Sequence, residues 1–144
     1  MVKKWIVRVA IASAVIIVIV VLLIPSYHGY RPRAMMSEAV AILGGAKVPL
    51  AEYFADKRKW PNRADEVMGV TSGDYTERVE ITSGAGAASG ALTLTATMKS
   101  TGVYSNLAGK TVEISTEDDG KTWVCRSGRV NGIENKFLPA SCLP

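Results

Sequence analysis

Few residues of this chain have the types and spacing that catalysis or metal binding requires. The 144-residue sequence holds two Cys and one His, which is too few for the common zinc sites, haem ligand pairs and His-based triads. Asp118 and Asp119 are adjacent and precede a glycine, a pattern typical of a turn rather than of a calcium-binding loop. The sequence therefore predicts no enzyme, no metal site and no cofactor.

The charges are distributed unevenly along the chain. The net charge is +4, but residues 1–33 contain five basic and no acidic residues, whereas residues 64–144 contain seven basic and ten acidic residues. The excess of positive charge therefore belongs to the N-terminal part. The total does not imply a nucleic-acid-binding face over the rest of the chain.

One apolar stretch has the length of a membrane-spanning helix. Residues 5–24 contain only Arg8 and Ser13 as polar residues. Twenty residues form a helix of about 30 Å, which matches the hydrocarbon core of a bilayer. Arg8 stands near one end of the stretch, where its side chain can reach the headgroups. The stretch predicts a membrane anchor or a helix buried among other copies.

The flanks of this stretch indicate its orientation. Lys3 and Lys4 precede it, which predicts a cytoplasmic N-terminus and a C-terminal part outside the cytoplasm. A cleaved secretory signal is the alternative. Its apolar region would be shorter and would end in small residues, whereas Pro25, Ser26 and Tyr27 follow here.

Cys125 and Cys142 both lie in the part expected outside the cytoplasm. In that compartment thiols are oxidised, so we expect a disulfide between them. Two free buried thiols are the alternative.

The apolar pattern after the anchor changes from helical to extended. Residues 33–59 have apolar residues at helical spacing, which predicts an amphipathic helix that ends at Trp60. Alternation of apolar and polar residues then predicts four short antiparallel strands around residues 79–81, 92–98, 112–114 and 122–126. Helix-breaking residues predict bends or local opening of the helix, and we assign helix flexibility to Pro25, Gly44, Gly45 and Pro49.

These elements predict three segments. Residues 1–32 form a hydrophobic transmembrane or filament-core half of one long helix, residues 33–62 its amphipathic half, and residues 63–144 a β-rich head with the Cys125–Cys142 loop. The amphipathic half is expected to cover the apolar face of the sheet. The first half has no partner within the chain, so lipid or neighbouring copies must bury it.

Two groups of residues carry a family resemblance. The apolar helix runs into Pro25-Ser26-Tyr27, then Arg33-Ala34 and Ser37-Glu38-Ala39, and near the C-terminus Trp123-Val124-Cys125 precedes Phe137–Cys142. Together they resemble the stalk and the disulfide-bounded loop of type IV pilins. The resemblance implies an α+β fold, in which a long N-terminal hydrophobic helix packs on a four-stranded antiparallel sheet with a C-terminal disulfide loop.

The N-terminal residues depart from the family pattern. Aligned on Pro25, Lys3 stands at the glycine of the prepilin-peptidase site, Lys4 at the new N-terminus and Arg8 at the usual glutamate. In the family this glutamate is thought to pair with the N-terminal amine of a neighbour during assembly. Arg8 reverses that charge.

The resemblance implies a structural subunit that polymerises through its hydrophobic helix into an extracellular type IV pilus-like filament for adhesion, motility or DNA uptake. Its partners would be other copies in a helical homopolymer, the pilus assembly machinery and, before assembly, the inner membrane, with the head outside the cytoplasm. The alternative is an uncleaved single-pass inner-membrane protein that regulates pilus assembly or takes part in DNA uptake. We assign the filament core to Val9, Val15, Val18, Leu22 and Pro25.

A basic surface patch is predicted in the loop between the cysteines. Arg126, Arg129 and Lys136 outnumber the single acid Glu134 there. Positioned cations are sufficient for phosphate contacts, so DNA is a conceivable partner. Because Phe137 is the one aromatic residue nearby, a solvated loop is the favoured interpretation.

Overall fold

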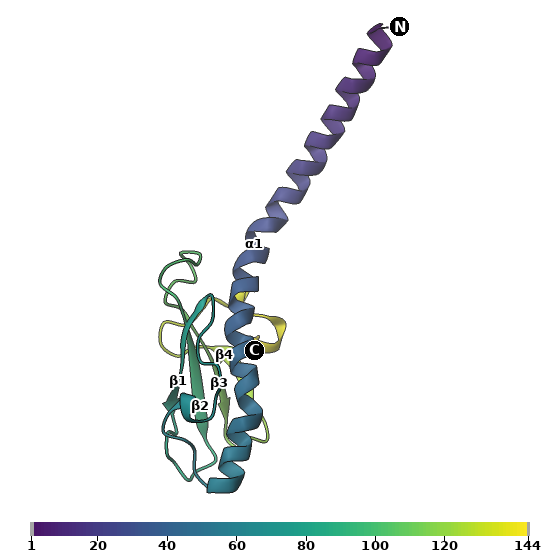
Figure 1. The fold of residues 1–144 in the computed structure, drawn as a ribbon. Helices are drawn as coiled ribbons and strands as arrows, with labels where there is room; N and C mark the ends of the chain where they lie inside the picture. The colour runs from purple at the N-terminus through teal and green to yellow at the C-terminus, as the bar shows by residue number, and fades with distance from the viewer. Residues whose placement is uncertain (1, 144) are drawn as a thin grey trace. The chain divides into compact units, whose positions relative to one another are not determined.

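A computed structural model of the chain describes the backbone of residues 2–143 and the side chains of residues 3–22 and 30–143. Its secondary structure consists of helix α1 (Val2–Lys57), strands β1 (Thr76–Ser83), β2 (Leu92–Met98), β3 (Thr111–Thr116) and β4 (Val124–Ser127), and the short 3₁₀ helices η1 (Ala64–Glu66), η2 (Asn135–Phe137) and η3 (Ala140–Cys142) (Figure 1). The chain divides into two compact units, one that ends at Arg31 and one that begins at Pro32. Helix α1 contributes to both.

The four strands form one antiparallel sheet in the order β1-β2-β3-β4. Each strand pairs with the next one along the chain, as short loops between antiparallel strands require. Leu94 pairs with Ile81 on one side and with Ile114 on the other, so these apolar side chains lie on the same face of the sheet. The predicted fold class and the four antiparallel strands are confirmed.

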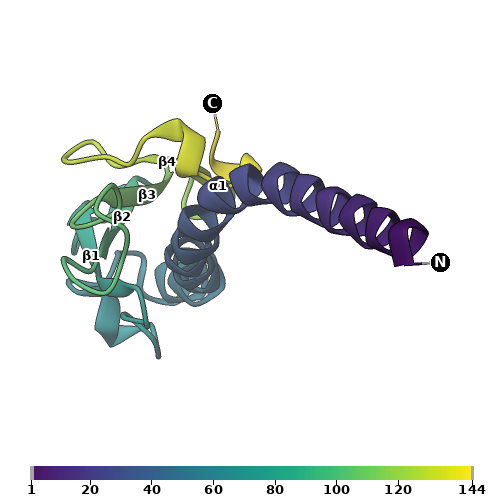
Figure 2. The same cartoon turned by 90° about the horizontal axis from the view of Figure 1, so that it is seen from above.

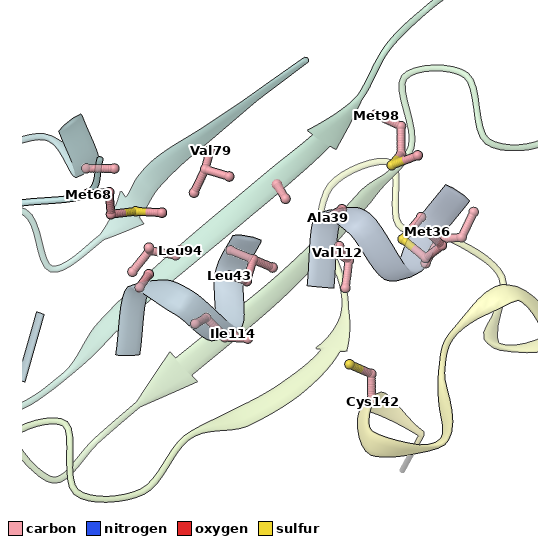
Figure 3. Packing of buried hydrophobic residues seen from close by; sticks show 14 of the residues in the cluster. Met36, Ala39, Leu43, Met68, Val79, Leu94, Met98, Val112, Ile114 and Cys142 are labelled. Atoms are coloured by element: carbon pink, nitrogen blue, oxygen red, sulfur yellow. The ribbon is translucent and has the colours of Figure 1, made fainter. Parts of the chain in front are cut away.

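The later half of α1 covers this apolar face. The buried residues of the helix recur every three or four positions, as one face of a helix requires, and they are Pro32, Met36, Ala39, Leu43, Ala46, Leu50 and Phe54. They form one cluster with buried residues of the sheet such as Leu94, Met98 and Val112 (Figure 3). In Figure 2 the strands lie along one side of this part of the helix.

Trp60 connects the end of the helix to the β1–β2 loop. Helix α1 ends at Lys57, and Arg58 adopts a left-handed conformation with φ 55°, a common way to end a helix. Trp60 is buried against Phe54, with 4.4 Å between ring centroids, and its indole Nε1 donates to the Ser89 carbonyl at 2.9 Å. The helix therefore ends before the predicted residue 59, where the chain turns to bury Trp60.

Strand β4 begins at Val124, two residues later than predicted. The Asp118 carboxylate accepts hydrogen bonds from the backbone N–H and the hydroxyl of Thr122, at 2.8 and 2.7 Å. These bonds lower the pKa of Asp118 to about 2. Thr122 is thereby held in the turn and does not join the strand.

The outer face of the sheet is less exposed than the alternating pattern predicts. Thr93 and Thr111 are buried, and Glu113 is only 2% exposed. The segment after β4 lies across this face, because the Thr111 hydroxyl donates to the Val130 carbonyl at 2.5 Å and the backbone N–H of Arg129 donates to Glu113 at 3.2 Å. Part of the face that the alternation predicts to be solvated is therefore covered.

Candidate functional site

The first unit presents an apolar helical surface. The most apolar 18 residues of Lys3–Leu22 have a mean hydropathy of 2.8, and none of Lys3–Leu22 is buried in the described part of the chain. Four of the five predicted filament-core residues are about half exposed or more, at 49% for Val9, 52% for Val15, 56% for Val18 and 70% for Leu22. Pro25 lies within α1, but its side chain is outside the described residues.

One side of this helix holds a shallow apolar groove of about 310 Å³. It is lined by Ile11, Ala14, Val15, Val18 and Ile19. Ile11, Val15 and Val18 are three or four positions apart, as are Ala14 and Val18, which is the spacing of side chains that pack against a second helix. All of its lining side chains are apolar.

The second half of α1 is also long enough to cross a bilayer, but it packs on the sheet of the head. The most apolar 18-residue window of Tyr30–Lys57 has a mean hydropathy of only 1.3, and 28% of that window is buried. The buried face of this segment packs on the sheet. This segment is therefore the core helix of the second unit.

The other residues assigned to helix flexibility lie in this half. α1 is helical without interruption across Gly44, Gly45 and Pro49. A Cβ at either glycine would meet nothing within 4 Å, so packing within this chain does not require glycine there. Flexibility at these positions stays a prediction.

The predicted disulfide between Cys125 and Cys142 is confirmed. Cys125 belongs to β4 and Cys142 to η3, and Cys142 is 1% exposed. The bond attaches the last residues of the chain to the edge of the sheet. It encloses the loop that carries the predicted basic patch.

The cations of that patch have carboxylate partners. Arg126 Nε donates to Glu113 Oε1 at 2.7 Å, Arg129 Nε lies 3.4 Å from the same oxygen, and Lys136 Nζ lies 2.7 Å from Glu134 Oε2. Arg126 and Arg129 thus share one buried carboxylate, while Lys136 pairs separately. Glu113 precedes the loop and lies on the neighbouring strand β3, so the charges of the loop do not indicate it.

Glu38 is a second acid whose hydrogen-bond partners the sequence pattern does not indicate. Its carboxylate accepts hydrogen bonds from the backbone N–H groups of Asp74, Tyr75 and Thr76, at 2.9 to 3.0 Å, and from the Thr76 hydroxyl at 2.9 Å. Burial opposes ionisation, but the hydrogen bonds more than offset it, and the pKa of Glu38 lies below its ordinary value. The partners follow 36 to 38 residues later, so only the fold reveals them.

Comparison with known proteins identifies the family. The pilin family, described as a bacterial filament family, matches residues 32–143, which is the second unit almost from end to end. The fimbrial protein EcpC of Eikenella corrodens is 38% identical over 136 residues, covering 92% of this chain and 84% of that protein.

Two relatives from Neisseria are more distant. The type IV major pilin protein PilE1 of Neisseria gonorrhoeae is 28% identical over 155 residues, with 92% of this chain and 87% of that protein covered. A fimbrial protein of Neisseria meningitidis serogroup A is 28% identical over 158 residues, with 92% and 88% covered. These matches agree with the fold in helix, sheet and disulfide, and the chain therefore belongs to the type IV pilin family, whose members are structural proteins of bacterial filaments.

Proposed function

We propose that this chain is a filament subunit that packs against neighbouring subunits through residues 5–24 and displays its head on an extracellular type IV pilus-like filament. The observation that carries the proposal is the apolar surface of residues Lys3–Leu22, none of which is buried in the described part of the chain. An exposed apolar surface of this size is not stable in water. Lipid before assembly and neighbouring helices after it would cover this surface.

The three predicted segments receive distinct roles in this proposal. Residues 1–32 insert in the inner membrane and later form the filament core, residues 33–62 join the core to the head, and residues 63–144 face the outside. Lys3, Lys4 and Arg8 support a cytoplasmic N-terminus before assembly. Transfer from membrane to filament would require the pilus assembly machinery.

Burial of apolar side chains would drive filament assembly wherever assembly removes the surface of the helix from water. Each Å² of apolar surface removed from water contributes about 25 cal/mol. Pro25, Gly44, Gly45 and Pro49 would let the helix bend or open locally when the filament is stretched, because proline and glycine weaken helical hydrogen bonding and packing.

Replacement of Val18 by Asp tests the proposal. An Asp in the middle of a membrane-spanning helix raises the free energy of insertion by about 2.5 to 3.5 kcal/mol. At position 18 its carboxylate would also lie in the apolar groove that includes Val18. We expect wild-type protein in the sheared surface fraction and Val18→Asp protein to be absent from it. Val130→Asp is the matched control, because Val130 is 80% exposed in the head. Recovery of normal Val18→Asp filaments would contradict the filament-core role.

The alternative function is that of an uncleaved single-pass inner-membrane pilin that regulates assembly or takes part in DNA uptake. The observation that favours it is the presence of Lys3, Lys4 and Arg8 where the family has its peptidase site and glutamate. Intact mass measurement and N-terminal sequencing of protein from sheared filaments and from membranes would separate the two functions. Full-length protein confined to membranes would support the alternative.

DNA binding receives little support from the C-terminal loop. Arg126 and Arg129 are paired with Glu113, and Lys136 is paired with Glu134. Phosphate contacts would have to compete with these carboxylates. We therefore base no part of the proposed function on DNA.

A further inference from the structure

The outer face of the sheet, which points away from α1, holds a polar groove in the head. The groove has a volume of about 390 Å³, which is in the size range of ligand-binding pockets. Its floor is strand β2, whose outward side chains are Thr93, Thr95 and Thr97. All residues that line it belong to the second unit, so the groove takes no part in the packing of residues 5–24.

Exposed side chains flank this floor on both sides. Thr93 in the floor is only 7% exposed. Arg78 and Glu80 of β1 line one side, with side chains that are 50% and 52% exposed, and Arg129 lines the side of β3, with a side chain that is 67% exposed. A recessed floor between raised walls is the concave shape that holds a ligand.

The charges that line the groove balance each other. They belong to two arginines and two glutamates. Arg78 Nε lies 2.7 Å from Glu80 Oε2, and Arg129 Nε lies 3.4 Å from Glu113 Oε1, which also accepts a hydrogen bond from Arg126 outside the lining. An anion would meet the carboxylates and a cation would meet the guanidinium groups. The groove therefore suits an uncharged polar ligand.

The floor has hydrogen-bonding capacity that the fold does not use. The Thr95 hydroxyl pairs with Thr82 Oγ1 at 2.8 Å, but no hydrogen bond joins the hydroxyl of Thr93 or Thr97 to another residue in the described part of the chain. Each of these hydroxyls can donate one hydrogen bond and accept two. The hydroxyl of Thr93 is thus unpartnered although the residue is more than nine-tenths buried.

The spacing of the three floor residues fits a ligand with repeated hydroxyl groups. Thr93, Thr95 and Thr97 extend over about 14 Å of the strand, and each of them presents a methyl group beside its hydroxyl. Sugar rings have the matching surface, because their hydroxyl groups alternate with patches of C–H. We propose that this groove binds a neutral oligosaccharide, whose hydroxyl groups form hydrogen bonds with Thr93 and Thr97.

Nuclear magnetic resonance of threonine methyl groups tests this site. The full-length chain is prepared in dodecylphosphocholine micelles, since this detergent has no sugar headgroup. The neutral probes are maltotriose, galactotriose and chitotriose, and trigalacturonate is the acidic comparison. Thr93→Val and Thr97→Val each remove a hydroxyl and keep a β-branched side chain. Thr101→Val, in an exposed turn outside the groove, is the matched control.

The expected result is a saturable shift of the Thr93, Thr95 and Thr97 methyl resonances with a neutral trisaccharide, and no shift at Thr101. Thr93→Val and Thr97→Val should each weaken this binding about tenfold, as loss of a hydrogen bond predicts, and Thr101→Val should leave it unchanged. The spectra of the free variants verify that each one is folded.

Three results would overturn the proposal. They are the absence of a saturable shift with every neutral probe at about 10 mM, tighter binding of trigalacturonate than of the neutral probes, and equal weakening by Thr101→Val. Because the groove lies in the head, each of these results would leave the packing role of residues 5–24 untouched.

Discussion

At the scale of single residues, the Glu38 carboxylate connects α1 to the start of β1. We expect Glu38→Gln to lower the free energy of unfolding by roughly 1 to 3 kcal/mol, because hydrogen bonds to a charged acceptor are lost. Glu52→Gln, an exposed position of the same helix, is the matched control and should change stability by less than about 0.5 kcal/mol. Denaturant titration of the two variants in detergent measures the difference.

The same contact predicts a dependence on pH. The pKa of Glu38 is lowered in the folded chain from its ordinary value of 4.5. A lowered folded-state pKa contributes stability that is present above the ordinary value and lost as the pH falls through the folded value. The stability advantage of wild type over Glu38→Gln should therefore shrink below pH 4.5. A constant difference down to strongly acidic pH would contradict the assigned hydrogen bonds.

Gly73 provides the space that the Glu38 carboxylate occupies. A Cβ at Gly73 would lie within van der Waals overlap of Glu38 Oε1, whereas a Cβ at Gly69 would meet nothing within 4 Å. We expect Gly73→Ala to destabilise the head by about 1 to 3 kcal/mol and Gly69→Ala to have little effect. In a thermal unfolding series, the effects of Gly73→Ala and Glu38→Gln should be less than additive, since both disrupt one contact.

At the scale of elements, the disulfide holds η3 to strand β4. Cys125 and Cys142 are 17 residues apart, and a loop of this size contributes about 3 kcal/mol in the chain-entropy model. Replacement of both cysteines by alanine should lower the free energy of unfolding by about this amount. A reductant should destabilise wild type similarly and leave the double variant unchanged, which denaturant curves with and without reductant would test.

At the scale of the whole molecule, the two units differ in what stabilises them. Every buried hydrophobic residue of the described chain lies between Met36 and Cys142, within the second unit. We expect a chain of residues 32–144 to be a soluble monomer with an intact disulfide, and its free energy of unfolding to match that of the full-length head within about 0.5 kcal/mol. Size-exclusion chromatography and denaturant titration measure both properties. Aggregation or loss of the fold would show that the head depends on residues 1–31.

The sequence by itself determined the features that repeat over short distances. The apolar run of residues 5–24 predicted an unpartnered helix, and the alternation around Leu92–Met98 predicted a strand of the sheet. Helical and extended chains have different side-chain periods, so these patterns are readable without a fold. The compartment of Cys125 and Cys142 likewise predicted their disulfide.

Only the tertiary structure decided which distant polar groups meet. Glu38 accepts hydrogen bonds from residues 36 to 38 positions later, and Glu113 pairs with Arg126 across two strands. The segment after β4 contacts Thr111 and Glu113 on the outer face of the sheet, and the alternation of apolar and polar residues within one strand does not predict this contact. Such contacts form between segments that are far apart in the chain. The sequence around a hydrogen-bond acceptor has no periodic pattern that identifies the distant donor.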